Sequence, residues 1–574
     1  MGMSSELKKK ASMLVTSVLA VSLMLSACSG GNNEGGNEPG ATAAPSGNGQ
    51  AADPAEGPGK VYDTQVQLTA VKLLDGDVKF KEGENIDNNA LDKAILEETG
   101  IQLKYLWTAA TRDSYLEKLR LGLSSGEPMP DILLIDDAAL RDQLIESGKY
   151  GEVGSLFDQY AFPEWKQALE ESPEAWNGIL KDGKRMGLPL MASKNQGDNV
   201  LWIREDWLRN LGLQAPTTMA EYEQVLEAFT KKDPDQNGKN DTFGTAIGLK
   251  DNWYDRWLGD ASFVFGSYGT VPHGWAKNEQ GQLYQPEYTP EFKQGLATIR
   301  GWIEKGYVPK DVGVYDEGKV QELVTSGKAG MVAGDYWLDI WPFPDLKKIT
   351  PTAEFKAYPL PVGADGKTKY STNDTTVGHY ILVSNKAKHP EAAILYMNWL
   401  FKNYLFPEKG SKYEYGLVEG YDWGTVDGQP TNDKAKLGDK YIDIIRISIP
   451  KNIMLPSLWL DMIKKFNGGG KPETPMEVRQ MGGENAVTLA AAKIVLDGIE
   501  KGYPQSNLAA TSPVGKAEAD KGGAVEKLRR EVQSQILYGK APVDSYDQFL
   551  DKANKLGYSD IVKEKNDWYA SVTK

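Results

Sequence analysis

The 574-residue chain has only one cysteine, Cys28, and three histidines, His273, His379 and His389. One thiol cannot form an intrachain disulfide or a cysteine metal cluster. The histidines are scattered, which excludes an HExxH metalloprotease and most zinc sites, and no cysteine within the fold is left for a Cys/His nucleophilic pair. Any catalysis would have to rely on carboxylates, tyrosines or serines.

Basic residues are also too few for a nucleic-acid-binding protein. The chain has 65 Lys and Arg against 80 Asp and Glu, a net charge of −15, which disfavours nucleic acid and anionic membrane surfaces as partners. No GxSxG, P-loop or strand-linked GxGxxG pattern supports an esterase, an NTPase or a dinucleotide enzyme. With 40% hydrophobic and 25% charged residues, the composition is that of a soluble globular protein.

The amino terminus predicts a lipoprotein signal peptide. Three lysines at 8–10 precede an apolar run at 13–27, which is too short to span a bilayer. Residues 25–28 (Leu-Ser-Ala-Cys) resemble the bacterial lipobox, in which a signal peptidase cuts before a lipidated cysteine. We therefore expect a signal peptide at 1–27 and acylation (a palmitate-type anchor) at Cys28. An ordinary secretory signal with a leftover thiol is the alternative.

Residues 29–59 contain nine glycines and four prolines, and no aromatic residue, Leu, Ile, Val or Met. Such a segment cannot form a core, so we expect residues 28–59 to be a disordered tether with a reach of roughly 30 Å. The predicted location is the outer face of the cell membrane, held by lipid, as in Gram-positive bacteria.

From Lys60 onward the sequence alternates strand and helix patterns. Apolar runs typical of strands occur at 61–74, 101–107 and 130–136, and helical patterns occur between them at 88–99 and 113–126. This order favours an α/β fold with parallel strands. In such sheets ligands bind beyond the carboxyl ends of the strands, which here follow 101–107 and 130–136.

Several segments resemble the extracellular solute-binding lipoproteins of carbohydrate ABC importers (family 1). The large variety with a calcium loop, which includes alginate-oligosaccharide-binding proteins, is the most similar. The segments that carry the resemblance are 125–136 (SGEPMPDILLID), 201–229 (LWIREDWLRNLGLQAPTTMAEYEQVLEAF), 306–312, 379–401, 415–423 and 538–571.

The resemblance implies a two-lobed, periplasmic-binding-protein-like fold (type II) with discontinuous lobes that close on ligand like a hinged clamp. We expect lobe one at 60–190 plus 357–425, and lobe two at 191–356 plus 426–574. The resemblance also implies a monomer that binds an oligosaccharide and passes it to permease subunits driven by an ATPase. The predicted activity is capture, with no catalysis.

The segment KKDPDQNGKNDTFG (231–244) predicts a structural Ca²⁺ site. Alternating oxygen ligands and a glycine turn at loop position 6 are typical of a calcium loop, but position 12 is Gly244 instead of a bidentate glutamate. A carboxylate from elsewhere, or water, would have to complete the shell. The alternative is a turn held by its own Asx hydrogen bonds. The expected ligands are Asp233, Asp235, Asn237, Lys239 and Asp241.

Aromatic residues with a polar edge are abundant, with 15 Trp and 27 Tyr against 14 Phe. Such rings stack on the apolar faces of sugars, while polar side chains bind the hydroxyls. For each ring the alternative is a place in the core, and for each polar residue it is surface solvation or a helix cap. The candidate substrate-binding residues are Trp107, Asp136, Asp137, Arg204, Trp253, Trp257, Asp335, Trp337, Asp374, His379 and Trp423.

Two other functions stay open. A surface carbohydrate-active enzyme would need two carboxyls at a set separation, and the adjacent pairs Asp136/Asp137 and Glu205/Asp206 are no evidence for one, because neighbours on a strand point to opposite faces. A binding protein for a peptide or a sensory ligand is the third reading. The sequence does not indicate whether a sugar ligand is neutral or acidic, because the basic residues show no obvious cluster.

Overall fold

The computed structural model describes residues 57–573, except 75, 77, 373–376, 452 and 484–485. Residues 55–574 form one compact unit that contains a five-stranded and a four-stranded sheet. Within the described ranges, no helix has both the length and the apolar character needed to cross a bilayer. The predicted signal peptide and the lipidation site Cys28 lie outside the described residues, as does Asp374.

The first sheet has the strand order β2-β1-β3-β14-β6. Strand β1 pairs in parallel with β2 and β3, whereas β14 is antiparallel to β3 and β6. The alternation predicted for residues 61–136 is confirmed. The strands are β1 (Val66–Leu73), β2 (Ile101–Ala109), β3 (Ile132–Ile135), β6 (Leu188–Met191) and β14 (Val377–Val383), and the helices of this lobe include α1 (Ala90–Thr99), α2 (Arg112–Ser125), α3 (Ala138–Glu146), α4 (Gly154–Tyr160), α5 (Pro163–Glu171) and α12 (Ala392–Leu400).

Local sequence signals fix the ends of the first two helices. The side chain of Asn89 caps α1, and Gly100 ends it with a left-handed φ of 74°. Thr111 and Ser114 form a reciprocal capping box at the start of α2, which satisfies amides that the helix itself leaves unpaired. The chain therefore passes from β2 into α2 within two residues, and Arg112 lies at the carboxyl end of the sheet.

The second sheet has the order β12-β7-β11-β8, with β7 antiparallel to both neighbours and β11 parallel to β8. Every residue of β7 and β11 is buried, because helices cover both faces. The strands are β7 (Asn199–Arg204), β8 (Phe243–Ala246), β11 (Ala329–Asp335) and β12 (Phe355–Tyr358), and the helices are α6 (Glu205–Leu211), α7 (Met219–Lys231), α8 (Ser262–Gly266), α9 (Phe292–Lys305), α10 (Glu317–Thr325), α11 (Phe343–Ile349), α16 (Ala486–Glu500), α17 (Lys516–Leu537), α18 (Ser545–Leu556) and α19 (Tyr558–Val572).

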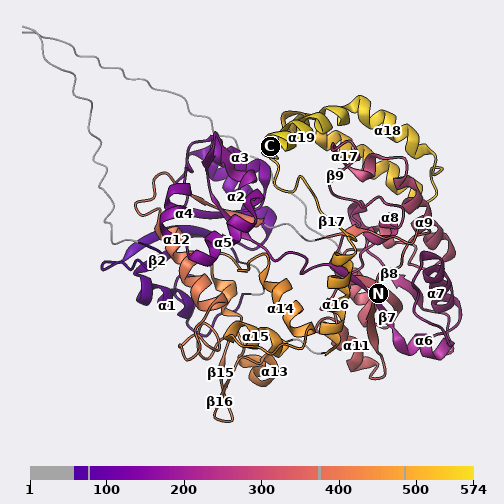
Figure 1. Cartoon of the computed structure of the whole chain (residues 1–574), viewed down its shortest axis with the longest axis horizontal. Coiled ribbons are helices and arrows are strands. Elements are labelled where there is room, and N and C mark those ends of the chain that lie inside the picture. The colour runs from indigo at the N-terminus through magenta and orange to yellow at the C-terminus, as the bar shows by residue number, and fades with distance from the viewer. Residues whose placement is uncertain are drawn as a thin grey trace, which may run out of the picture. The chain divides into compact units, whose positions relative to one another are not determined.

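The last three helices, α17 to α19, pack on one another and on α9, and they are the yellow elements in Figure 1. Shorter strands form two-stranded ladders outside the main sheets. These are β4 (Leu180–Lys181) with β5 (Lys184–Arg185), β9 (Ala276–Lys277) with β10 (Leu283–Tyr284), β13 (Tyr370–Ser371) with β17 (Pro504–Gln505), and β15 (Gly424–Val426) with β16 (Gln429–Thr431).

The chain connects the two sheets repeatedly. It runs from β6 to β7 through residues 192–198 and returns from β12 to β14 through 359–376. A further connection is helix α14 (Leu458–Asn467), whose Met462 and Phe466 pack in the core of the first sheet while Trp459 and Ile463 pack against the second. Discontinuous lobes are therefore a property of this topology.

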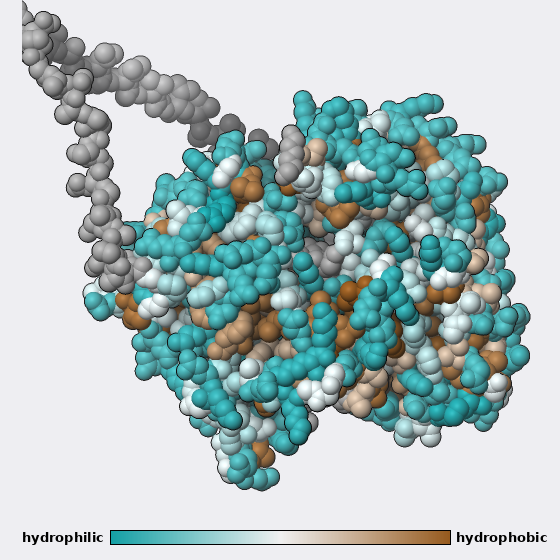
Figure 2. Space-filling model, viewed as in Figure 1, coloured by the Kyte–Doolittle hydropathy of each residue, from teal (hydrophilic) through white to brown (hydrophobic). Residues whose placement is uncertain are grey.

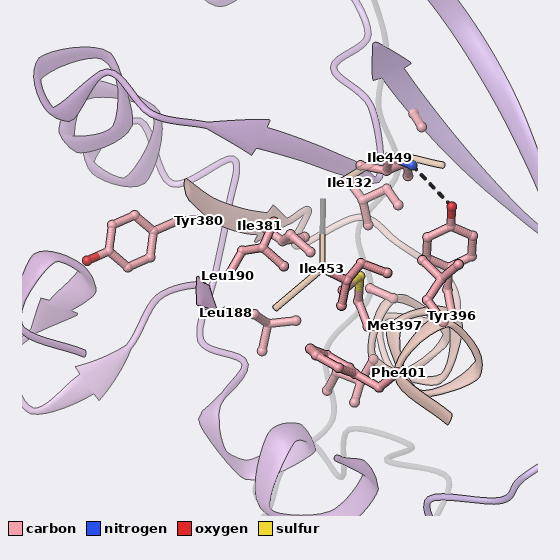
Figure 3. Packing of buried hydrophobic residues seen from close by; sticks show 14 of the residues in the cluster. Ile132, Leu188, Leu190, Tyr380, Ile381, Tyr396, Met397, Phe401, Ile449 and Ile453 are labelled. Atoms are coloured by element: carbon pink, nitrogen blue, oxygen red, sulfur yellow. Dashed lines mark hydrogen bonds between the residues drawn. The ribbon is translucent and has the colours of Figure 1, made fainter. Parts of the chain in front are cut away.

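The packing differs from the predicted lobe boundaries in two segments. Leu360 and Tyr370 belong to the core of the second sheet, although 357–425 was assigned to lobe one. Apolar residues of 444–451 and 453–455, predicted for lobe two, pack in the first core: Ile449 and Ile453 lie among side chains of β3, β6, β14 and α12, and the Ile449 amide donates to Tyr396 Oη at 3.2 Å (Figure 3). No local pattern marks which sheet an apolar segment will join, so these boundaries required the tertiary contacts.

The chain is hydrophilic on average, with a mean hydropathy of −0.47. On the face shown in Figure 2, teal residues dominate, and brown hydrophobic residues are most frequent near the middle. Some large apolar side chains are exposed on separate elements, such as Leu121 on α2 and Ile349 on α11. Isolated exposed residues of this kind are normal and indicate no interface by themselves.

Candidate functional site

A cavity of about 860 Å³ is lined by residues of both lobes. Leu190 and Met191 at the end of β6 and His379 on β14 come from the first sheet, and Asp335 and Trp337 at the end of β11 come from the second. The volume lies in the upper part of the roughly 300–1,000 Å³ range of ligand pockets. Its place beyond the strand ends agrees with the rule for ligand sites in α/β proteins.

A second cavity of about 270 Å³ shares Leu190 and His379 with the first. It lies at the carboxyl ends of β1 and β3, and Asp136 lines it. Arg112 Nε and Nη2 donate to the two oxygens of Asp136 at 2.7 and 3.0 Å. His379 Nε2 lies 3.9 Å from Asp136 Oδ2, and burial lowers the pKa of this histidine. The structure therefore brings the predicted residues Asp136 and His379 together.

Asp335 ends β11 and is 5% exposed. Among the described residues, its side-chain Oδ1 has no hydrogen-bond partner. Burial raises the pKa of Asp335 well above its ordinary value, and the nearby carboxylates Asp198, Asp255 and Asp260 raise it further. A buried acceptor oxygen without a donor costs free energy, so this position favours a ligand that brings a hydroxyl group.

Three tryptophans form a stack beside Asp335. Trp257 lies 5.6 Å from Trp337 at an interplanar angle of 15°, and 5.3 Å from Trp341 at 22°. Trp337 lines the cavity, and Trp341 is 44% exposed. Trp257 and Trp337 are among the predicted site residues. Trp341 follows Trp337 in the segment GDYWLDIWP (334–342).

The far end of the cavity is formed by first-lobe residues that the sequence did not single out, together with helix α13 (Lys434–Leu437) and helix α15 (Pro475–Gly483). Arg479 on α15 lies 5.4 Å from the ring centre of Tyr404, and burial lowers its pKa. Asp422 accepts the amides of Leu417 and Val418 at 2.7 and 2.9 Å, and burial raises its pKa to about 6. Tyr415 and Asp422 could have been found in the segment 415–423, but Arg479 carried no signal.

Some predicted substrate residues serve the fold instead. Asp137 Oδ1 caps helix α3 by accepting the Leu140 amide at 2.8 Å. Arg204, 2% exposed, forms a bidentate pair with Asp206 and stacks on Trp207 at 4.7 Å. Neither Asp137 nor Arg204 lines either cavity. The contacts of Asp137 are those of a helix cap, and the contacts of Arg204 are those of a buried core residue.

Of the predicted tryptophans only Trp337 lines either cavity; Trp257 stacks on it, and the other three lie elsewhere. Trp107 contacts Tyr115 edge-to-face at 5.5 Å, and Tyr115 does line the smaller cavity. Trp423 lies behind Tyr415, with ring centres 5.8 Å apart. Trp253, 46% exposed, stacks on His273 at 4.1 Å in another part of the second lobe.

The predicted calcium loop connects α7 to β8. Asp233 accepts the amides of Asn237 and Gly238 at 3.1 and 3.0 Å, and Asn237 Nδ2 donates to Asp235 Oδ2 at 2.8 Å. Asp235 Oδ1 is buried without a partner in the described part of the chain, and burial next to Asp233 raises its pKa. Asp241 pairs with Lys328 Nζ at 2.5 Å.

The same loop gives mixed support for a cation. No group of three or more His, Cys, Asp or Glu side chains in the described residues has the arrangement of a metal site. The side chain of Lys239 supplies no oxygen, so that residue would contribute its backbone carbonyl. An orphaned carboxylate oxygen and a glycine turn at Gly238, with φ 78°, nevertheless fit a loop that wraps a hard cation.

Sequence comparison finds relatives that include two sugar-binding proteins. The chain is 30% identical over 285 residues to the polygalacturonan/rhamnogalacturonan-binding protein YtcQ of Bacillus subtilis, covering 48% of this chain and 50% of that protein. It is 29% identical over 242 residues to the fructooligosaccharide ABC transporter substrate-binding protein FusA of Streptococcus pneumoniae, covering 39% and 43%. The chain thus matches about half the length of these relatives.

Structure comparison gives the fold. The alginate-binding protein AlgQ2, solved without calcium ion, superimposes with a TM-score of 0.60 and 17% identity, covering 90% of this chain and all of that chain. The neighbours have the two-lobed periplasmic-binding-protein-like architecture, which confirms the predicted fold class. The family model for bacterial extracellular solute-binding proteins matches residues 81–403, more than half of the chain. The chain therefore belongs to the bacterial extracellular solute-binding protein family.

Proposed function

We propose that this chain is the substrate-binding component of an ABC importer and that it captures an oligosaccharide in the 860 Å³ cavity. The observation that carries the proposal is that two groups line the cavity together at the end of β11: the ring of Trp337, and Asp335, whose Oδ1 has no hydrogen-bond partner among the described residues. An aromatic face and a buried acceptor are what the C–H face and the hydroxyl edge of a sugar require. Relatives that bind polygalacturonan and fructooligosaccharides support the ligand class.

The mechanism is capture by lobe closure. Because the cavity is lined from both lobes, a ligand in it contacts both and favours the arrangement in which they are closed. The shift can be no larger than the difference in affinity between the open and closed forms. The closed protein then docks on permease subunits driven by an ATPase, as the ABC transporter relative suggests.

The location at the membrane is part of the proposal. Lipidation of Cys28 holds the protein at the outer face, and residues 29–59 act as the tether. A tether raises the effective concentration of the binding protein near its permease. Mass spectrometry of the mature protein would test this: the expected amino terminus is a diacylated Cys28, and a Cys28→Ser variant should leave the membrane fraction.

The calcium loop is proposed as a structural site. Asp233, Asp235, Asn237 and Asp241 would supply side-chain oxygens, and Lys239 a backbone carbonyl. The cation would stabilise the turn between α7 and β8 and would take no part in ligand binding, because the loop residues do not line the cavity.

The central test is a titration of the full-length chain in detergent micelles with neutral and acidic oligosaccharides. Tryptophan fluorescence should saturate, and chromatography of the same samples should recover the sugar unchanged. Product formation would instead identify a carbohydrate-active enzyme. A chain that binds no oligosaccharide but binds peptides would indicate a peptide or sensory receptor.

A further inference from the structure

The cavity is lined by a guanidinium group, that of Arg479, with a buried donor that no described residue engages. Arg479 donates from Nη2 to the backbone oxygen of Tyr404, but its Nε is buried without a partner, and it forms no ion pair within the described part of the chain. Glu477 on the same helix α15 is engaged by Lys465, at 2.9 and 3.0 Å. A buried guanidinium with unused donors is costly unless a ligand supplies the acceptor.

A second cation lines the same end of the cavity. Lys434 on α13 lies with its Nζ 4.8 Å from the ring centre of Tyr441 and makes no ion pair with a described residue. Both rings, Tyr404 and Tyr441, also line the cavity. Two cations beside two aromatic faces form a surface suited to a sugar ring that bears a negative charge.

The acidic residues at this end of the cavity have partners of their own. Asp433 pairs with Lys436 at 3.6 Å, and Asp443 with Arg446 at 3.4 Å. Asp422 attracts Arg479 electrostatically, but its two oxygens accept backbone amides and it forms no hydrogen bond with Arg479 Nε. Asp335 comes from β11 of the second lobe, next to Trp337. Among the described residues, the cationic groups at the first-lobe end of the cavity that form no ion pair are therefore Arg479 and Lys434.

We propose that Arg479 and Lys434 form a carboxylate subsite, so that the captured oligosaccharide contains uronic acid residues. The proposal rests on the oligosaccharide-binding function above and decides the class of sugar within it. The flat guanidinium matches a carboxylate with two parallel hydrogen bonds, and the ring of Tyr404 helps to hold its plane. Hydroxyl groups further along the chain of sugars reach Asp335 and Trp337.

Matched pairs of ligands test the proposal. Calorimetric titrations of the full-length chain use galacturonate, mannuronate and guluronate oligosaccharides of three to four residues, each as the free acid and as its methyl ester, together with neutral fructooligosaccharides. The esters keep the ring and the hydroxyl groups but lose the charge. At least one free acid should bind about tenfold or more tightly than its ester, and added salt should reduce this preference.

Variants assign the preference to the named residues. Arg479→Gln should weaken binding of the acid about tenfold and leave the ester within roughly threefold, so that the preference disappears. Arg479→Lys keeps the positive charge but lacks the two parallel donors of the guanidinium, so it should restore part of the preference for the acid. Lys409→Gln, an exposed lysine that does not line the cavity, is the matched control. Thermal unfolding of each variant verifies that it is folded.

The possible outcomes separate this proposal from the one it rests on. If esters or neutral sugars bind at least as tightly as the acids, or if Arg479→Gln keeps the preference for acids, oligosaccharide binding stands and the carboxylate subsite is refuted. If no acid, ester or neutral sugar binds, the proposed function itself fails and the subsite fails with it. A preference for acids that Arg479→Gln abolishes supports both.

Discussion

The guanidinium of Arg204 donates through Nε and Nη2 to the two carboxylate oxygens of Asp206, at 2.8 and 2.6 Å. Both side chains are largely withdrawn from solvent, at 3% and 14% exposure. The pair lies where β7 passes into α6, away from the residues that line the ligand cavity. It joins the strand to the helix that covers it.

Removing one member of this pair should cost stability without affecting ligand affinity. Arg204→Met leaves Asp206 without its partner, and we expect a loss of about 3–5 kcal/mol in the free energy of unfolding. Chemical denaturation measures the loss, and the double variant Arg204→Met/Asp206→Leu should recover most of it. A folded Arg204→Met variant that has lost ligand binding would return Arg204 to the binding site.

Trp337 should dominate the aromatic contribution to ligand binding. Trp337→Ala removes the ring that lines the cavity, and we expect a loss of affinity of about 2 kcal/mol, roughly thirtyfold. Fluorescence or calorimetric titration measures it. Trp253→Ala is the matched control, because Trp253 stacks on His273 outside the cavity. Equal effects of the two variants would contradict the assignment of the site.

Asp335 should favour binding at the expense of stability. Its pKa is raised by burial and by three neighbouring carboxylates, so the folded state binds this proton more tightly than the unfolded state does. The resulting penalty grows as pH rises above the ordinary value of 3.8. At neutral pH, Asp335→Asn should therefore stabilise the protein by about 1 kcal/mol and weaken ligand binding about tenfold. A lower unfolding temperature for Asp335→Asn than for the wild type would contradict this prediction, because it would show that the carboxylate stabilises the fold.

His273 should make the protein sensitive to acid. Its Nε2 accepts the Tyr254 amide at 3.1 Å, and burial lowers its pKa from 6.5 to about 3. The unfolded state therefore takes up the proton first, and stability falls by up to about 1.4 kcal/mol per pH unit as pH drops below 6.5 toward 3.

Substitution tests this origin of the acid sensitivity. His273→Gln keeps an acceptor and removes the titration, so its unfolding temperature should fall less between pH 7 and pH 5 than that of the wild type. His389→Gln, at a histidine with 42% exposure, is the control. Parallel pH profiles for the wild type and His273→Gln would assign the sensitivity to other groups.

Calcium should stabilise the second lobe. If the loop 233–241 binds Ca²⁺, adding the ion to the chelator-treated protein should raise the unfolding temperature, because the ion binds only the folded loop. Asp233→Ala should remove the response, and Glu279→Gln, at an exposed acid outside the loop, should not. A wild-type protein that does not respond to Ca²⁺ would favour a turn held by its Asx hydrogen bonds alone.

The site could be predicted in part because some of its residues follow recognisable strands. Asp136 comes directly after the apolar strand 132–135, so its place beyond the strand end follows from the α/β pattern. Asp335 and Trp337 are candidates through their side-chain chemistry alone, because no strand is predicted before them. Arg204 also ends a strand, yet its side chain turns to Asp206. The pattern gives the position of the backbone, while the neighbours decide where a side chain points.

Local patterns suffice for the α/β class, for the helices at 88–99 and 113–126 and for the family, because these depend on periodicity and on motifs within short segments. Tertiary packing alone places Ile449 and Ile453 in the first core and brings Arg479 and Trp337 into the lining of one cavity. These groupings bring together residues that are far apart in the sequence, such as Ile449 with Ile132 and Arg479 with Trp337, and either sheet could bury the same apolar segment. Their selection depends on packing of the whole chain, which no local pattern contains.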